Sequence, residues 1–153
     1  MAEGVVRLRQ AGKTYIRDVA RLLNASTTTE ATYYPAIRAL LSEMLAAESL
    51  PFDVRINTSE RRGGGGTDLP DVAFYDGSGD FVVVCGEVKL PAEEIDAMAS
   101  STGRKDQVGR YLAKTRAALL SNVRAFGLLT VEPSWTGRGA VPPEARRLEQ
   151  VVM

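Results

Sequence analysis

The chain has 153 residues, 44% of them hydrophobic and 25% charged, which is the composition of a single globular domain with a core of moderate size. It contains no histidine, which excludes Ser-His-Asp triads, histidine-ligated metals and zinc sites that mix Cys with His. Its one cysteine, Cys85, lies in an apolar run and is predicted to be buried and inert. The 19 basic residues balance the 19 acidic ones, so no overall field draws the chain to a polyanion.

The N-terminal residues lack the charged segment and apolar core of a secretion signal. No apolar run approaches the roughly 18 residues that a membrane span needs. We therefore expect a cytoplasmic protein without membrane contact. Any acid-base or metal chemistry must then depend on Asp, Glu, Lys, Tyr and water.

Apolar residues at helical spacing predict two N-terminal helices. The first covers 13–24 and is expected to form an N-terminal cover spanning 1–26. The second ends near residue 49 and has an N-cap signal at 27–30. Pro35 leaves two alternatives open, because proline removes an amide donor: the helix begins near Pro35, or it kinks there.

Three strands are predicted next. Residues 52–57 alternate apolar and polar side chains, which predicts a strand at an edge of the sheet with one solvated face. Four consecutive glycines within 60–67 predict a mobile loop. Residues 71–76 and 81–89 are predicted to be the two arms of a hairpin.

The ends of this hairpin bring chemistry-bearing side chains together. Asp71 opens one arm, whereas Glu87 and Lys89 close the other, so the three side chains converge if the arms are antiparallel. Glu87 and Lys89 share a strand face because successive side chains alternate. Two carboxylates beside an ammonium suit a hard cation such as Mg²⁺ together with a substrate phosphate. Phosphodiester hydrolysis is therefore the first chemistry to consider.

The remaining elements are predicted to be a helix over 104–122 and a fourth strand within 123–131. A right-handed crossover through that helix would join the third and fourth strands. The basic residues of the helix are interpreted as a solvated face: Arg104, Arg110, Lys114 and Arg116. Residues 132–153 are interpreted as a linker and the start of a further helix, leading into a downstream domain that the chain lacks.

The order of these elements, with Pro70-Asp71 and Glu87-Val88-Lys89 on neighbouring strands, resembles the PD-(D/E)XK nuclease superfamily over 27–131. The resemblance implies an α/β, restriction-endonuclease-like core in which helices flank a central mixed four-stranded sheet in the order αβββαβ. Gln107-Val-Gly-Arg-Tyr111 matches the QxxxY element of many RecB-like and Mrr-like members. The motif by itself is not specific, so its weight comes from its placement on these elements.

The resemblance also implies a role for each site residue. Asp71, Glu87 and the backbone carbonyl of Val88 would hold Mg²⁺, for which Mn²⁺ would substitute. Glu30 would assist through water or a second ion. Lys89 would orient the attacking water and offset charge in the transition state.

Gln107 and Tyr111 would steady Lys89 or a phosphate oxygen. The implied activity is that of a Mg²⁺-dependent endodeoxyribonuclease that cuts double-stranded DNA and leaves 5′-phosphate and 3′-hydroxyl ends. Residues 29–36 are similar to the N-terminal nuclease modules of restriction-modification enzymes of the type IIG and single-chain helicase-containing kinds. This similarity implies covalent neighbours such as methyltransferase, helicase and target-recognition domains, and a dimer would serve two-strand cleavage.

Each of these residues also has a purely structural interpretation. Asp71 after a proline is a common turn residue. Glu87 and Lys89 could form a surface ion pair. Glu30 could complete a capping box with Thr27. Gln107 and Tyr111 at i and i+4 could be an ordinary helix-face pair.

Three alternatives to a restriction-type nuclease remain open. The first is a module that keeps the nuclease fold without catalysis and docks to a partner or to DNA. The second is an ordinary α/β interaction domain with an accidental motif, which predicts Asp71 and Glu87 far apart. The third is a junction resolvase or a transposon-type nuclease, although a resolvase usually has a strongly basic face.

Overall fold

The structure is a computed structural model that describes residues 2–25, 28–56, 69–103 and 106–153. The predicted glycine-rich loop and Thr27 of the proposed capping box lie outside these residues. The helices are α1 (Ala2–Leu23), α2 (Glu30–Ala47), α3 (Ile95–Ser100), α4 (Gln107–Thr115) and the short 3₁₀ helix η1 (Pro143–Ala145). The strands are β1 (Asp53–Ile56), β2 (Val72–Tyr75), β3 (Val82–Val88), β4 (Ala117–Ser121), β5 (Ala125–Val131) and β6 (Arg146–Val152).

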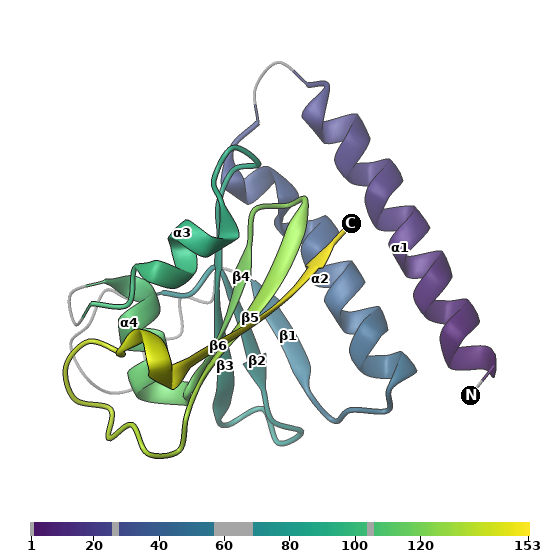
Figure 1. Ribbon diagram of the computed structural model, residues 1–153. Coiled ribbons are helices and arrows are strands. Elements are labelled where there is room, and N and C mark those ends of the chain that lie inside the picture. The colour runs from purple at the N-terminus through teal and green to yellow at the C-terminus, as the bar shows by residue number, and fades with distance from the viewer. Residues whose placement is uncertain (1, 26–27, 57–68, 104–105) are drawn as a thin grey trace.

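The strands form one mixed sheet with the order β1-β2-β3-β4-β5-β6. Only the β3–β4 pair is parallel among the described pairs, and α3 and α4 provide its crossover connection. Helices α1 and α2 cover one face of this sheet, whereas α3 and α4 cover the other (Figure 1). The result is a three-layer α/β/α arrangement with one hydrophobic core on each face.

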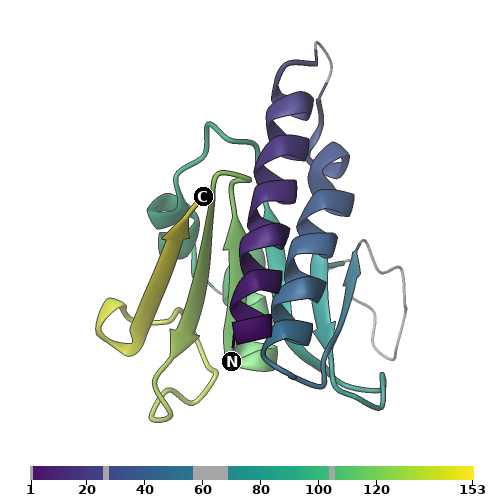
Figure 2. The same cartoon turned by 90° about the vertical axis from the view of Figure 1, so that its right-hand side faces the viewer.

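The α1–α2 layer lies across the sheet as an antiparallel helix pair (Figure 2). Its core is built from Tyr33, Ile37 and Leu40 of α2 together with Val54 and Val88 of the sheet. Helix α2 begins at Glu30 and continues through Pro35, so the alternative in which the helix begins near Pro35 is wrong. Its N-cap is Thr29, whose backbone N–H donates to the Thr32 hydroxyl.

On the other face of the sheet, α4 packs directly against the backbone of the 102–103 segment. A Cβ built on Gly109 would lie 2.2 Å from the Gly103 carbonyl oxygen and 2.7 Å from that of Thr102. Glycine therefore allows the 102–103 segment to lie directly against α4. Val108, Tyr111 and Leu112 of α4 then pack into the core on this face.

The sheet has six strands, so the predicted four-stranded sheet is wrong in strand number. The predicted helix over 104–122 is also too long, because α4 ends at Thr115 and β4 follows at once. Arg116 ends the helix in the left-handed region, with φ of 61°, and its guanidinium donates to the carbonyls of Glu132 and Trp135. Ala117–Ser121 is an apolar run buried between β3 and β5, and periodicity cannot distinguish such a central strand from a buried helix.

The predicted helix at the C-terminal end is wrong as well. Pro143 starts only the three-residue η1, and the following residues form β6. β6 pairs antiparallel with β5 from Arg146↔Val131 to Val152↔Ala125. An unpaired edge of β5 would leave a row of backbone N–H and C=O groups without partners, and β6 satisfies them. No described helix is both long and apolar enough to span a membrane.

Candidate functional site

The first part of the candidate site is the end of the β2–β3 hairpin. Val72 pairs with Gly86 in the antiparallel register, so Asp71, directly before β2, lies beside Glu87 near the end of β3. The predicted convergence of these two carboxylates is therefore seen in the structure. It excludes the alternative in which an accidental motif leaves Asp71 and Glu87 far apart.

Asp71 is held by two neutral donors. The Tyr34 hydroxyl of α2 donates to Oδ1, and the backbone N–H of Val88 donates to Oδ2 at 2.9 Å. Burial, and after it the hydrogen bond to Asp71, raises the pKa of Tyr34, so this hydroxyl keeps its proton at neutral pH. Both oxygens of the carboxylate are thus fixed in position without a cationic partner among these contacts.

Glu87 has different surroundings. Its side chain is only 7% exposed, and Oε1 lies 2.6 Å from Lys89 Nζ. Burial raises the pKa of Glu87, and the hydrogen bond from Lys89 opposes that shift without cancelling it. The negative charges of Asp71 and Glu30 act in the same direction as burial. A buried carboxylate with other carboxylates nearby favours the binding of a cation.

Lys89 lies between two acids from different elements. Its ammonium is 2.6 Å from Glu87 and 3.8 Å from Glu30 Oε1, at the start of α2. Partial burial disfavours the charged form, but the bond to Glu87 and the surrounding carboxylates outweigh it, so the pKa of Lys89 is raised. Lys89 is therefore a permanent cation at neutral pH and the counter-charge of this group.

Glu30 is not part of the predicted capping box. Thr29 is the N-cap of α2, which makes Glu30 the first helical residue, and the partner of the cap is Thr32. Glu30 is therefore free of the capping role, and its carboxylate faces Lys89 at the distance given above. An acid in the first turn also suits the positive end of the helix dipole.

Gln107 and Tyr111 reach the same site from α4. The Gln107 amide donates to the Tyr111 hydroxyl, which lies 3.4 Å from Glu87 Oε2 and 3.5 Å from the Leu69 carbonyl oxygen. Burial raises the pKa of Tyr111, although the bond from Gln107 opposes the shift, so the hydroxyl remains a donor. The i, i+4 pair is thus connected to a site carboxylate rather than being an isolated helix-face pair.

Tyr34 is a site residue that sequence reasoning missed, because a tyrosine at helical spacing among apolar residues indicates packing rather than a site. The sequence feature that could have identified Tyr34 is its spacing from Glu30: Tyr34 follows Glu30 by four residues and so lies on the same helix face. The spacing repeats that of Gln107 and Tyr111 on α4. One tyrosine from each helix layer therefore contacts one carboxylate of the hairpin.

The donor chemistry of this group suits a hard divalent cation. Three carboxylates, from Glu30, Asp71 and Glu87, outnumber one ammonium, and hard cations prefer such oxygen donors. Within the described ranges, however, no three His, Cys, Asp or Glu side chains form a ready metal cluster. Glu87 is instead paired with Lys89, so a cation would bind Glu87 by displacing the ammonium, whereas each Asp71 oxygen keeps a lone pair beside the hydrogen bond that holds it.

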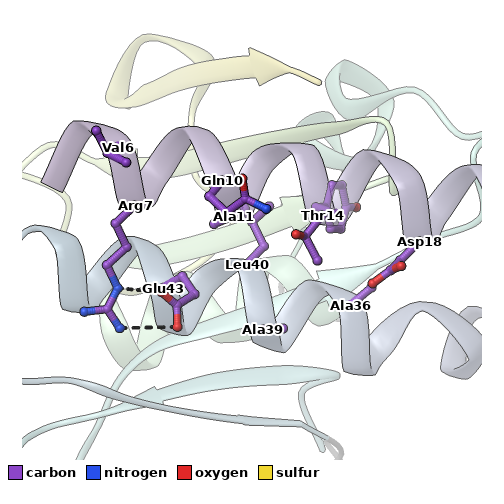
Figure 3. Close-up of a pocket in the computed structure, with 11 residues that line it drawn as sticks. Val6, Arg7, Gln10, Ala11, Thr14, Asp18, Ala36, Ala39, Leu40 and Glu43 are labelled. Atoms are coloured by element: carbon purple, nitrogen blue, oxygen red, sulfur yellow. Dashed lines mark hydrogen bonds and ion pairs between the residues drawn. The ribbon is translucent and has the colours of Figure 1, made fainter. Parts of the chain in front are cut away.

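A separate hollow of about 300 Å³ lies between α1 and α2. Its lining includes the small side chains Ala11, Ala36 and Ala39, and the Arg7 guanidinium donates to Glu43 at one end (Figure 3). Its other acid, Asp18, lies toward the opposite end (Figure 3). This groove is lined by residues of the two helices alone and shares none with the site at the hairpin.

The comparisons with known proteins identify a fold and no family. No protein-family model matches the sequence, and no curated protein matches it. Among solved structures, a chain of the DrdV–DNA complex determined by cryo-EM matches with a TM-score of 0.58 and 16% sequence identity. The match covers 94% of this chain and 12% of that chain. The chain therefore has the α/β fold of a small part of a protein solved in complex with DNA.

Proposed function

We propose that this chain is a Mg²⁺-dependent DNA endonuclease module of the PD-(D/E)XK kind, the cleavage part of a restriction-modification enzyme. The observation that carries the proposal is the meeting of Asp71, Glu87 and Lys89 at the end of one hairpin. A fold shared with a chain of a DNA complex supports DNA as the substrate. The proposed substrate is the phosphodiester backbone of duplex DNA.

Asp71, Glu87 and the carbonyl of Val88 are the proposed cation ligands, with Glu30 assisting. The Val88 N–H already points toward Asp71, and in a strand the carbonyl of the same residue points to the same side. Mg²⁺ bound there would lower the pKa of a coordinated water and neutralise charge on the phosphate. Mn²⁺ is expected to substitute, because it accepts the same oxygen ligands.

Lys89 has the proposed role of holding the attacking water and of offsetting negative charge on the phosphate. Its ammonium carries three donors, and its raised pKa keeps it charged. The water oxygen forms a bond to phosphorus as the bond to the 3′-oxygen breaks; the attacking water gives up a proton to solvent, and the leaving 3′-oxygen takes one up from solvent. The products carry 5′-phosphate and 3′-hydroxyl ends.

The two tyrosines have the proposed role of fixing the carboxylates. Tyr34 holds Asp71, and Tyr111, with Gln107 behind it, holds Glu87 or a phosphate oxygen. Partners of this kind orient a ligand and are worth about 10- to 100-fold in metal affinity or activity.

The chain spans 12% of the length of the DrdV chain that it matches. We therefore propose that methyltransferase, helicase or target-recognition domains supply specificity from elsewhere in a longer polypeptide. The balance of 19 basic and 19 acidic residues agrees with a module that depends on other parts for much of its DNA affinity. Cleavage of both strands by one site per chain would need two copies or two successive events.

The test is nicking and linearisation of supercoiled plasmid at high protein concentration with Mg²⁺ or Mn²⁺. Asp71→Asn and Lys89→Ala are expected to reduce the rate by about 100-fold or more. Glu3→Gln and Lys13→Ala are the matched controls, because they remove an acid and a cation from α1, and they are expected to cleave like the wild type. Cleavage that survives in Asp71→Asn would place the activity elsewhere or in a contaminant.

A second candidate is a non-catalytic module that keeps the nuclease fold. It is favoured by the absence, in the part of the chain that the structure describes, of a ready three-acid metal cluster. The two candidates differ in cation binding. Calorimetric titration with Mn²⁺ should give binding that Asp71→Asn abolishes if the module is a nuclease, and no such binding if it only docks.

A further inference from the structure

One edge of the sheet is formed by the seven-residue strand β6, which is the outermost strand on its side (Figure 2). It contains neither proline nor lysine, residues that commonly block pairing at a sheet edge. The strand at the opposite edge, β1, has only four residues, and the Arg38 guanidinium already donates to its Val54 carbonyl at 3.1 Å. A long edge strand is a template for pairing with another chain, whereas a short and covered one is not. β6 is therefore the edge that suits a partner strand.

The hydrogen bonds between β6 and β5 use every second residue of β6. Backbone bonds join Met153 to Arg124 and Glu132 to Ala145, at the two ends of the pair. Bonded and non-bonded pairs alternate along an antiparallel register, so the odd-numbered residues of β6 bond to β5. The even-numbered residues therefore direct their N–H and C=O groups to the free edge: Arg146, Leu148, Gln150 and Val152. Within the described ranges, no other residue bonds to these edge groups.

The side chains of β6 lie on two faces of the sheet. Gln150 faces α3, because its amide donates to Asp96 at 2.8 Å. Leu148, two residues away on the same face, packs against the core there. Arg147 and Glu149 consequently lie on the opposite face, where both are exposed. A cation and an acid thus stand side by side on one face of an open edge.

These charges restrict how β6 can pair with a second copy of itself. A parallel pairing about a two-fold axis would place each charge beside its own copy. In an antiparallel pairing, an axis at Arg147 or at Glu149 would place that residue directly opposite itself, and like charges directly opposite each other are destabilising. An axis at Leu148 instead places Arg147 of each copy opposite Glu149 of the other. This register also brings even-numbered residues opposite even-numbered ones, so their free N–H and C=O groups meet.

We propose that a second copy of this chain pairs antiparallel along β6 with the two-fold axis at Leu148, which joins two six-stranded sheets into one. Leu148 then exchanges backbone bonds with its own copy, and Arg146 exchanges them with Gln150 on either side of the axis. Arg147 keeps its internal bond to Glu132, because a guanidinium has further donors for a second carboxylate. Strand direction reverses across the axis, so the two β2–β3 hairpin ends point to opposite edges of the joined sheet. The pairing is therefore independent of the proposed function.

The first test is sedimentation equilibrium of the 153-residue chain over a wide range of concentrations. Wild type is expected to show a monomer–dimer equilibrium. Gln150→Pro removes an N–H that points to the free edge, so it keeps the bonds to β5 and should weaken the dimer by about tenfold or more. Gln150→Ala is the matched control: it loses the same side-chain bond to Asp96 but keeps the N–H, and it should dimerise like wild type. A wild type that is monomeric at its highest soluble concentration, or equal dimerisation of the two variants, would overturn the inference.

Charge variants test whether Arg147 of one copy faces Glu149 of the other. Arg147→Glu is expected to weaken the dimer by about tenfold, because an acid then faces Glu149 at two places. Arg147→Glu/Glu149→Arg restores opposite charges across the axis and should recover most of that loss. The internal bond to Glu132 is absent from both variants, so recovery reports the contact between copies. A double variant as weak as the single one would contradict the proposed register.

Single cysteines locate the axis. In the proposed register the Cα atoms of the two Leu148 residues lie about 5.5 Å apart, a separation that a disulfide can span. The two copies of Glu149 are offset by about 7 Å along the strands, and those of Gln150 by about 13 Å. Cys85 is buried and common to all variants.

Mild oxidation of Leu148→Cys is therefore expected to give a covalent dimer about tenfold faster than oxidation of Glu149→Cys or Gln150→Cys. Each rate is divided by the rate at which the same thiol reacts with a small disulfide, because Leu148 is half-buried and the other two are exposed. Faster cross-linking at 149 or 150 would place the axis elsewhere and overturn the inference. Equally slow cross-linking at all three positions would also overturn it.

Discussion

The two helix layers contribute to the site in different ways. α1 and α2, with 22 and 18 residues, cover their face of the sheet through large side chains, and α2 reaches the site with Glu30 and Tyr34. α4 has nine residues and depends on backbone contact at Gly109, yet it supplies Gln107 and Tyr111. The long helices depend on many side-chain contacts, whereas the short α4 adds to its buried side chains one backbone approach that only glycine allows.

The largest expected effect is therefore on α4. Gly109→Ala should lower the free energy of unfolding by about 1–3 kcal/mol, because its Cβ would overlap backbone oxygens of the 102–103 segment. Gly12→Ala in α1 is the matched control: its Cβ would meet only Met153 Cε, at 3.8 Å, and it should stabilise the protein by about 0.5–1 kcal/mol. Urea denaturation measures both, and equal stabilities of the two variants would refute the comparison.

The second-largest expected effect is on plasmid cleavage, and it differs between Tyr34 and Tyr111. Tyr34→Phe should raise the Mg²⁺ concentration needed for half-maximal plasmid cleavage by about tenfold, because Asp71 keeps only the Val88 N–H among these donors. Tyr111→Phe should instead lower the rate several-fold at saturating Mg²⁺, because its bond to Glu87 is long and Lys89 still pairs with Glu87. The measurement is the cleavage rate as a function of Mg²⁺.

Tyr75→Phe is a control for this pair, because Tyr75 lies at the far end of β2 from Asp71. It should change neither the rate nor the Mg²⁺ dependence. If both site variants changed only the maximal rate, Tyr34 would have no part in positioning a cation ligand.

The smallest effect is on the pH dependence of stability in the cation-free protein. Burial raises the pKa of Glu87, so the folded state holds this proton more tightly than the unfolded chain does. The contribution favours folding below the ordinary value of 4.5 and is lost as the pH rises through the raised value. Glutamine does not titrate, so Glu87→Gln does not lose stability in this pH range. The stability of this variant relative to wild type should therefore increase from acidic to neutral pH, as measured by urea denaturation in EDTA.

For Glu43 on α2, the expected pH dependence of stability has the opposite sign. The hydrogen bond from Arg7 lowers the pKa of Glu43, which adds stability above 4.5 that is lost as the pH falls through the lowered value. Glu43→Gln should therefore lose stability relative to wild type at neutral pH and match it in acid, by a small amount because the pair is exposed. The same trend in both variants would contradict this assignment of causes.

The elements with strong local signals were predictable. The apolar periodicity of 13–24 and of α2, the alternation in β1 and the turn residues at 76–80 predict helices, an edge strand and a hairpin from the sequence, although α1 begins eleven residues earlier than predicted, at Ala2. The hairpin then determines that Asp71 and Glu87 meet, because antiparallel arms bring their ends together. Glu87 and Lys89 lie on one face for the same local reason.

β4 and β6 could not be predicted in the same way. Ala117–Ser121 is apolar without a strand period, and its state depends on insertion between β3 and β5. Arg146–Val152 is mostly exposed and forms a strand because β5 offers a free edge. In both cases partners that are distant in the sequence decide the conformation.

The sequence by itself determined the residue types of the site and the spacings that place them on strand ends and helix faces. Tertiary structure decided which of them meet: that Tyr34 contacts Asp71, that Glu30 faces Lys89 rather than capping its helix, and that Tyr111 reaches Glu87 from the opposite layer. Spacing along one element follows from backbone geometry, which is local. The contacts of α2 and α4 with the strand ends depend on how two helix layers pack on opposite faces of one sheet, and no local pattern encodes that packing.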